Sequence, residues 1–279
     1  MFLAYLALLA SLAAASSRWV PPELDQLLLE GVDDVYRMKF DGAEENARKA
    51  IAVNPEHPNA YMGLAAVVWT RYVYETDQGD DRLIDEFDRR TAKAVEVAQR
   101  WLKKHPDDAQ AMMTLGAAYG LSSRLQLIRQ RWIAGYLKGK KALSLTKAAL
   151  KVDPELWDAY LGLGMYDYYS DLYPRFIGVL AKIVLRGNRQ RGIESLRIVA
   201  EKGHYSRNNA KILLVEIYTE DPYGAQDPEG AVAIMKELRD QFPQSAMMHS
   251  AQLVALFTAR RYDQVVDGAR EPRVELLVI

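Results

Sequence analysis

The sequence predicts an all-α fold, a right-handed solenoid of antiparallel helix pairs, some of them lengthened or interrupted by inserted helices. Four prolines each end a stretch with helical apolar periodicity and precede another such stretch. They are Pro55, Pro106, Pro154 and Pro243. A small residue stands twelve places before each of them, at Ala43, Ala94, Ala142 and Ala231. Because small residues let two helices approach closely, this spacing predicts helices packed in repeated pairs.

Length and composition suit such a fold and exclude several functions. The chain has 279 residues, of which 49% are hydrophobic and 26% charged, enough for a sizeable core. Its formal net charge of -1 gives no basic excess, so we expect no nucleic-acid partner. The absence of cysteine excludes disulfides, thiol catalysis and cysteine-based metal sites. We expect no cofactor and no metal ion.

The first element that the sequence predicts is an export signal. An apolar run from Phe2 to Leu12 leads to small residues, with Ala13 and Ala15 at the two positions that a signal peptidase recognises. We therefore expect a signal peptide at residues 1–15, a short linker at 16–21, and a periplasmic or secreted product, peripheral to the envelope membrane. No Lys or Arg precedes the apolar run, which leaves an uncleaved anchor, a misassigned start or a buried helix as alternatives.

The repeats follow, and their first helices carry a second signature. The segment Leu115-Gly116-Ala117-Ala118-Tyr119 fits the pattern L-G-x-x-Y, and Leu163-Gly164 repeats its first half. The chain resembles the tetratricopeptide repeat, in which small residues join two helices and a proline ends the second. This resemblance implies about five repeats and a partial sixth over residues 22–268, followed by an irregular or truncated tail at residues 269–279.

The spacing departs from the 34-residue period of that family. Pro55 and Pro106 are 51 residues apart, and Pro106 and Pro154 are 48 apart. We therefore expect lengthened or inserted helices at Arg82–Arg90, Arg124–Lys138 and Leu172–Arg186. In the fourth repeat, the stretches Gly164–Pro174 and Gly187–Gly192 resemble the inclusion-body clearance proteins of the mitochondrial outer membrane and their bacterial relatives.

The family resemblance also implies a binding surface. In such repeats, fixed places on the first helix line the concave face, and a protein or peptide partner lies against them. Carried over to this chain, those places are Asn59, Met62, Trp69, Gln110, Met113, Asp158, Met165, Tyr168 and Tyr169. Adaptable methionines and aromatic rings suit an apolar segment in a groove. The alternative is that an inserted helix, notably Leu172–Arg186, folds back and buries these side chains as core.

A basic middle section is the second candidate surface. No acidic residue occurs from Leu121 to Val152, whereas basic residues alternate there with Trp132 and Tyr136. The candidate basic surface is formed by Arg124, Arg129, Arg131, Lys138, Lys140 and Lys141. Basic residues beside aromatic ones favour an anionic membrane or an acidic partner. The alternative is a solvated helix face whose charges meet the acidic first repeats or another copy.

Catalytic motifs are missing, so we expect a binding scaffold of the cell envelope rather than an enzyme. Two other classes stay open. Asp167 and Asp171 stand four residues apart and could form a carboxylate pair of an enzyme or enzyme subunit. A structural assembly component is the third class, because Pro272 interrupts the last helix where a polar capping helix is usual. Oligomeric state does not follow from the sequence.

Overall fold

A computed structural model describes residues 20–76, 79–172, 187–221 and 224–270. Within these ranges the chain forms α-helices and one π-helical turn, η1, without any strand. The elements are α2 (Pro22–Tyr36), α3 (Phe40–Val53), α4 (Pro58–Thr70), η1 (Arg71–Glu75), α5 (Asp81–Lys104), α6 (Ala109–Ile128), α7 (Trp132–Val152), α8 (Ala159–Leu172), α11 (Arg189–Lys202), α12 (Arg207–Glu220), α13 (Pro228–Gln241), α14 (Ala246–Thr258) and α15 (Tyr262–Ala269). The predicted signal lies outside the described residues. Among the helices described, none is long and apolar enough to span a bilayer.

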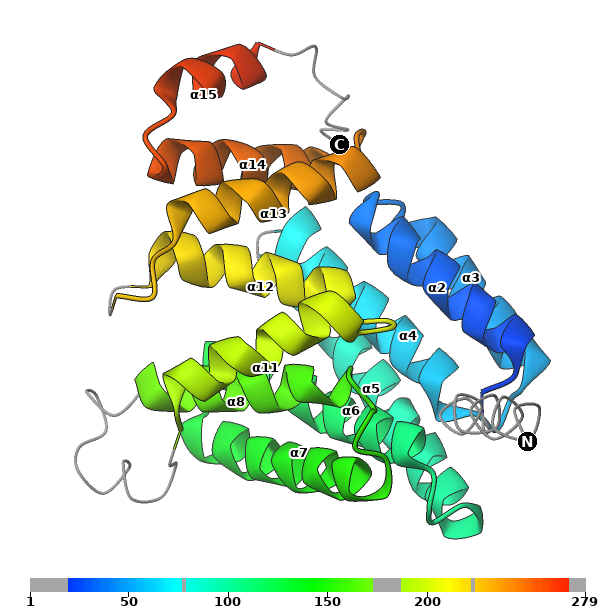
Figure 1. The fold of residues 1–279 in the computed structure, drawn as a ribbon. Helices are drawn as coiled ribbons and strands as arrows, with labels where there is room; N and C mark the ends of the chain where they lie inside the picture. Colours follow the sequence, from blue (N-terminus) through cyan, green and yellow to red (C-terminus); the bar gives the residue numbers. More distant parts are fainter. Residues whose placement is uncertain (1–19, 77–78, 173–186, 222–223, 271–279) are drawn as a thin grey trace, which may run out of the picture.

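Consecutive helices pack as antiparallel pairs that stack into a solenoid (Figure 1). The pairs are α2/α3, α4/α5, α6/α7, α8/α11, α12/α13 and α14/α15. First helices of neighbouring pairs also touch, as α2 touches α4, α4 touches α6 and α12 touches α14. Each pair thus buries its apolar face against the next one. The predicted all-α solenoid of helix pairs is confirmed.

The four prolines end the second helix of a pair, as the sequence predicts. Helices α3, α5, α7 and α13 all stop two residues before a proline. The cap residues in between are Asn54, His105, Asp153 and Phe242, and their ψ angles lie between 64° and 97°. A proline ring excludes the helical conformation from the residue before it, which explains why the helix ends at this place.

Small residues lie where paired helices touch. Ala231 is fully buried, and a Cβ atom on Gly116 of α6 would lie 3.3 Å from the Ala142 carbonyl oxygen of α7. The closest approach occurs between α8 and α11. There, a Cβ atom on Gly164 would lie 2.9 Å from the carbonyl oxygen of Gly192. Backbone therefore meets backbone in the fourth pair, which no side chain larger than hydrogen permits without a shift.

Three helices are longer than the others, which accounts for the irregular spacing. Helix α5 has 24 residues, α6 has 20 and α7 has 21, whereas α2 and α3 have 15 and 14. Two of the predicted insertions, Arg82–Arg90 and Arg124–Lys138, lie within these long helices or the turn between them. Of the third, Leu172–Arg186, residues 173–186 lie outside the described ranges.

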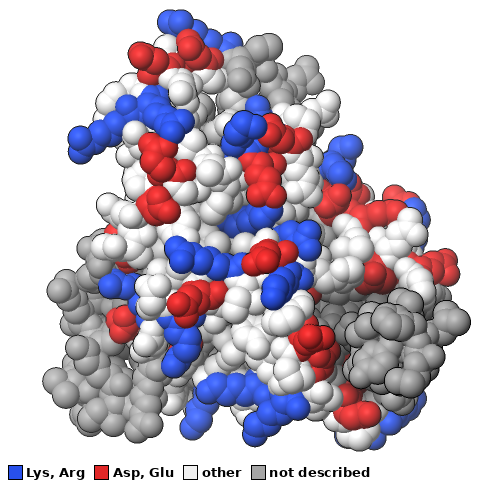
Figure 2. All heavy atoms as spheres, in the orientation of Figure 1, with Lys and Arg blue, Asp and Glu red and all other residues white. Residues whose placement is uncertain are grey.

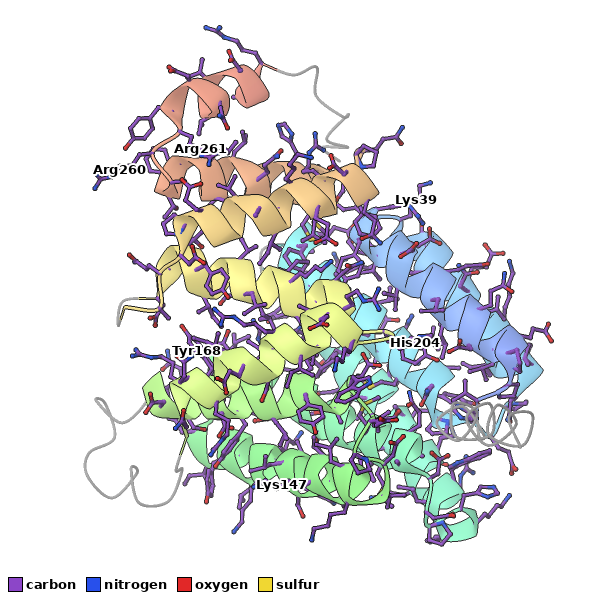
Figure 3. The ribbon with its side chains drawn as sticks, in the orientation of Figure 1. Lys39, Lys147, Tyr168, His204, Arg260 and Arg261 are labelled. Atoms are coloured by element: carbon purple, nitrogen blue, oxygen red, sulfur yellow. The ribbon has the colours of Figure 1, made fainter. Side chains whose placement is uncertain are left out.

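The turns inside three of the pairs share one backbone motif that the sequence analysis missed. Met38, Gln130 and Arg260 have φ near +60°, and the next residue donates its N–H to a carbonyl five residues earlier, as in a Schellman cap. A basic residue and then an aromatic residue follow in every case. The three sequences are Lys39-Phe40, Arg131-Trp132 and Arg261-Tyr262. Lys39, Arg260 and Arg261 are labelled in Figure 3.

The first helix pair also contacts the later pairs, so the solenoid curls back toward its own start. The rings of Tyr36 on α2 and Phe242 after α13 lie 5.5 Å apart. Asp25 of α2 accepts a hydrogen bond from the Tyr205 hydroxyl, and its carboxylate lies 2.9 Å from Nε2 of His204. The loop that carries His204 reaches toward α2 and α4 in Figure 3. These contacts join parts of the chain 179 to 206 residues apart.

His57 is a buried histidine that should make stability depend on pH. Its ring is fully buried, Nδ1 accepts the N–H of Asn59 at 3.3 Å, and Nε2 has no hydrogen-bond partner among the described residues. Burial lowers the pKa of His57 from 6.5 to about 4. The folded state therefore keeps the ring neutral at pH values where the unfolded chain already binds a proton.

We expect this burial to contribute stability that is complete above pH 6.5 and is lost as the pH falls toward 4. A difference of about 2.5 pKa units corresponds to about 3 kcal/mol. Urea unfolding at several pH values measures this effect. As the pH falls, the free energy of unfolding should decline more steeply for the wild type than for His57→Asn, which keeps a capping acceptor without a titrating ring. Equal slopes in the two proteins would contradict this account.

Candidate functional site

The structure buries five of the nine predicted concave-face residues. They are Asn59, Trp69, Gln110, Asp158 and Tyr168. Met62, Met113, Met165 and Tyr169 are half-buried. These five side chains lie in the packed interior, so the expectation of an open partner surface has to be corrected for them.

Trp69 belongs to the core between α4 and α5. Its ring lies 5.6 Å from the ring of Phe87 and 6.2 Å from that of Tyr72, and the Arg124 guanidinium lies 5.6 Å from its centroid. The lengthened first part of α5 supplies Phe87 and therefore closes this side of the ring. The basic residue Arg124 is half-buried and turned toward this ring, whereas the sequence predicted it on the basic surface.

The buried polar members of the list connect helices to one another. Asn59 of α4 accepts a hydrogen bond from the Thr114 hydroxyl of α6 at 2.6 Å. Tyr168 of α8 donates to Asp221 at 3.0 Å. Burial, followed by this hydrogen bond, raises the pKa of Tyr168, so it stays a neutral donor at physiological pH. Both side chains join one repeat to another.

Asp158 has a comparable structural role. Its carboxylate accepts the backbone N–H groups of Ser206 at 2.8 Å, His204 at 3.1 Å and Tyr205 at 3.3 Å. These donors lie directly before α12, which has no cap from its own side chain. A carboxylate at the positive end of a helix is favourable, so Asp158 caps α12 from a different repeat.

The proposed carboxylate pair is divided between two environments. Asp167 is buried and accepts two hydrogen bonds from the Arg191 guanidinium, both at 2.5 Å. Asp171 is exposed. Asp167 therefore connects α8 to α11 through an ion pair. Over the described ranges, no group of three or more His, Cys, Asp and Glu side chains could hold a metal ion.

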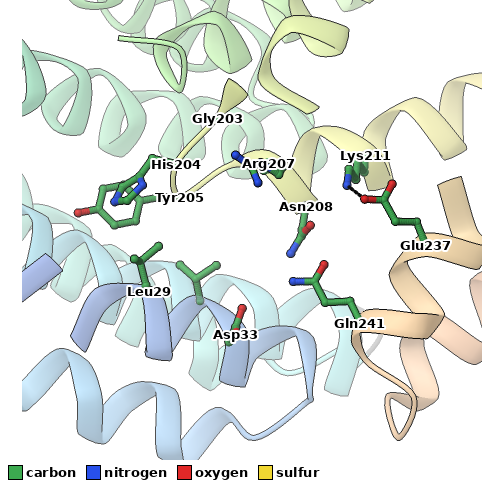
Figure 4. Close-up of a pocket in the computed structure, with 11 residues that line it drawn as sticks. Leu29, Asp33, Gly203, His204, Tyr205, Arg207, Asn208, Lys211, Glu237 and Gln241 are labelled. Carbon is green, nitrogen blue, oxygen red and sulfur yellow. Dashed lines mark hydrogen bonds and ion pairs between the residues drawn. The ribbon is translucent and has the colours of Figure 1, made fainter. Parts of the chain in front are cut away.

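A pocket of about 250 Å³ opens where α2 meets α12 and α13 (Figure 4). Leu29 and Val32 of α2 form its apolar wall. On the opposite wall, Lys211 of α12 is buried and its Nζ donates to Glu237 of α13 at 2.5 Å. The volume suits one or two side chains or a short stretch of main chain rather than a whole cofactor.

Asn208 is a buried polar residue of this pocket whose side-chain oxygen has no hydrogen-bond partner among the described residues. Its side chain is 8% exposed, and Oδ1 accepts no hydrogen bond from any described residue. Asn208 and Gln241 both extend into the pocket in Figure 4. A buried acceptor left unsatisfied costs about 1–3 kcal/mol. Because this oxygen is itself covered, the side chain has to rotate before a donor in the pocket can satisfy it.

The other basic residues of the candidate surface lie at the turn between α6 and α7 and along α7. Arg129, Arg131, Lys140 and Lys141 are exposed, and Lys138 is half-buried. Lys141 Nζ lies 4.2 Å from the Tyr119 ring centroid and donates to its hydroxyl at 2.7 Å. The structure thus places all six predicted basic residues on the α6/α7 hairpin, with Arg124 turned toward Trp69.

Comparison with known proteins finds a family match over the first helices. Residues 28–71 match the tetratricopeptide repeat family. This match spans most of α2, all of α3 and α4, and the first residue of η1. The later pairs repeat the same helix–turn–helix arrangement. The described fold is therefore an all-α helical-repeat scaffold with a segment similar to the tetratricopeptide repeat.

A thermophilic TPR protein from Thermus thermophilus is similar in structure. It shares 20% sequence identity with this chain, at a TM-score of 0.49. The superposition covers 84% of this chain and 99% of that protein. No curated protein matches the sequence.

Proposed function

We propose that this protein is a scaffold that binds a protein or peptide partner, with the pocket between α2, α12 and α13 as the contact point. Helical repeats of this type generally serve protein interactions. The observation that carries the proposal is the unsatisfied Oδ1 of Asn208 inside a pocket that has both apolar and charged walls. A peptide N–H satisfies this oxygen once the amide group rotates toward the pocket, and peptide side chains offer apolar groups for Leu29 and Val32.

The proposal places this scaffold in the cell envelope, because the apolar run and small residues of positions 1–15 are typical of an export signal. It also includes a closer relationship to the inclusion-body clearance family. The sequence around the Gly164 and Gly192 contact suggests that relationship.

Selection of short random peptides displayed on phage tests the pocket. We expect wild-type protein to select peptides, and Asn208→Leu to bind the same peptides at least about tenfold more weakly by fluorescence anisotropy. Leucine has a similar size and removes an unsatisfied buried acceptor, so the variant should unfold at an equal or higher urea concentration than wild type.

The neighbouring residue supplies the matched control. Asn209 is exposed on the same helix, and Asn209→Leu should leave the peptide affinity unchanged. Loss of affinity without loss of stability at position 208 separates a binding role from a structural one. If Asn208→Leu binds as tightly as wild type, or if no peptide is selected, the pocket is not the partner site.

A further inference from the structure

Five large apolar side chains gather at the turn between α6 and α7. They are Ile128, Trp132, Ile133, Tyr136 and Leu137, together called the α6–α7 tip. Ile133 is 79% exposed, Leu137 60% and Trp132 51%. So large a group of exposed apolar side chains at one place on a protein surface usually marks a contact site.

The tip is a firmly built hairpin rather than a frayed helix end. Gln130 has φ of 59°, and the N–H of Arg131 bonds to the carbonyl oxygen of Gln126 at 2.8 Å, which completes the Schellman cap of α6. The Ser123 hydroxyl donates to the carbonyl oxygen of Gly135 at 2.7 Å. The apolar side chains are therefore held outward by ordered backbone.

The equivalent place in the first helix pair is covered. Phe40 follows the same turn motif as Trp132, yet it is buried and packs with Val67 of the next pair. The α6/α7 hairpin is longer, since α6 exceeds α2 by five residues and α7 exceeds α3 by seven. At about 1.5 Å per residue, the extra turns extend this hairpin by about 10 Å.

Beyond the tip, the exposed face of α7 carries positive charge. Ile133 and Leu137 are followed at helical spacing by Lys140, Lys147 and Lys151, which are exposed and lie on one face. Figure 2 shows Lys and Arg side chains along the lower edge of the molecule, over α7, and Lys147 points away from the helix stack in Figure 3. Among the described residues, none of the five lysines of α7 forms an ion pair.

We infer that the α6–α7 tip and the lysine face of α7 dock the protein on an anionic lipid surface. Trp and Tyr favour the boundary between headgroups and acyl chains, and Ile133 and Leu137 reach the apolar side of that boundary. The lysines then meet anionic headgroups. A second copy fits poorly, because two α7 faces without a single acidic residue would repel each other. This inference is independent of the pocket and of its ligand.

Co-sedimentation of the full-length chain with vesicles tests it. We expect binding to vesicles that contain phosphatidylglycerol, release as salt rises, and a shift of tryptophan emission to shorter wavelength on binding. Ile133→Ser combined with Leu137→Ser should weaken binding at least about tenfold, and so should Lys140→Glu combined with Lys147→Glu. Lys93→Glu with Lys103→Glu, the same charge change on α5, should have little effect.

If something other than an anionic membrane binds this surface, the experiments give a different result, and each such result overturns the inference. Equal binding to neutral vesicles, or none to either kind, rejects an anionic lipid surface. Capture of a poly-glutamate peptide but not of vesicles points to an acidic protein partner instead. A dimer in light scattering that becomes a monomer in the Ile133 and Leu137 variant identifies a second copy.

Discussion

Replacing Trp69 by Ala should lower the free energy of unfolding by about 3–5 kcal/mol, the range typical of a buried Trp truncation. Trp69 is 9% exposed, and its ring contacts Phe87, Tyr72 and the Arg124 guanidinium, so its removal leaves a cavity lined by groups from α5, η1 and α6. Urea unfolding followed by circular dichroism measures this loss. If Trp69 instead lined an open concave face, its truncation would cost less stability and would separately weaken the binding of a peptide.

Trp132→Ala is the matched control for this result. Its side chain is 51% exposed, so truncation should change the free energy of unfolding by no more than about 0.5 kcal/mol. The same change should weaken binding to anionic vesicles, whereas Trp69→Ala should not while the protein is folded. Similar stability losses in the two variants would show that the assignment of one ring to the core and the other to the surface is wrong.

The sequence predicted the features of the fold that depend on short stretches of chain. A proline acts on the residue directly before it, so Pro55 and Pro106 reveal helix ends without knowledge of the rest of the molecule. The same holds for small residues at a fixed distance from those ends, such as Ala43. The basic-aromatic dipeptides after the left-handed residues, for example Arg131-Trp132, were equally local and could have been found as a third repeat signal.

The candidate site depends on contacts between distant parts of the chain, which a repeat pattern does not encode. Assigning Trp69 to an open concave face presumed a helix pair of ordinary length. In this chain Phe87, from the lengthened part of α5, covers that ring. Asp158 was assigned in the same way, yet it caps α12 because the fourth and fifth pairs meet there.

The pocket is a clearer example of a site that a repeat pattern does not predict. Leu29 and Asn208 come to one pocket because the solenoid curls until α2 meets α12 and α13. That curvature is the sum of small rotations between successive pairs, and the irregular helix lengths of this chain change each of them. Nothing in the local sequence around Asn208 distinguishes it from Asn209, although one is buried and the other exposed.

Curvature of this kind requires close contacts between helices. The closest of them, between α8 and α11, gives the second prediction of a large loss of stability. Gly192→Ala should destabilise the fold by about 1–3 kcal/mol, because its Cβ atom would lie 2.7 Å from the Tyr168 nitrogen and 2.8 Å from the Gly164 carbonyl oxygen. Both neighbours are backbone atoms of α8, so only a displacement of one helix relative to the other relieves the overlap. This cost opposes the gain in helix propensity of about 1 kcal/mol that Ala normally brings.

Gly120→Ala makes the same chemical change without the contact. The nearest atom to its added Cβ is the Ala142 Cβ at 3.9 Å, an ordinary van der Waals distance, so we expect equal or slightly higher stability from helix propensity alone. Urea midpoints and slopes of both variants separate the two effects. Because Gly192 lies on α11 opposite Tyr168, which donates to Asp221 just after α12, a displacement of α11 should also disturb that hydrogen bond. Stabilisation by Gly192→Ala comparable to that of Gly120→Ala would show that α8 and α11 do not approach this closely in solution.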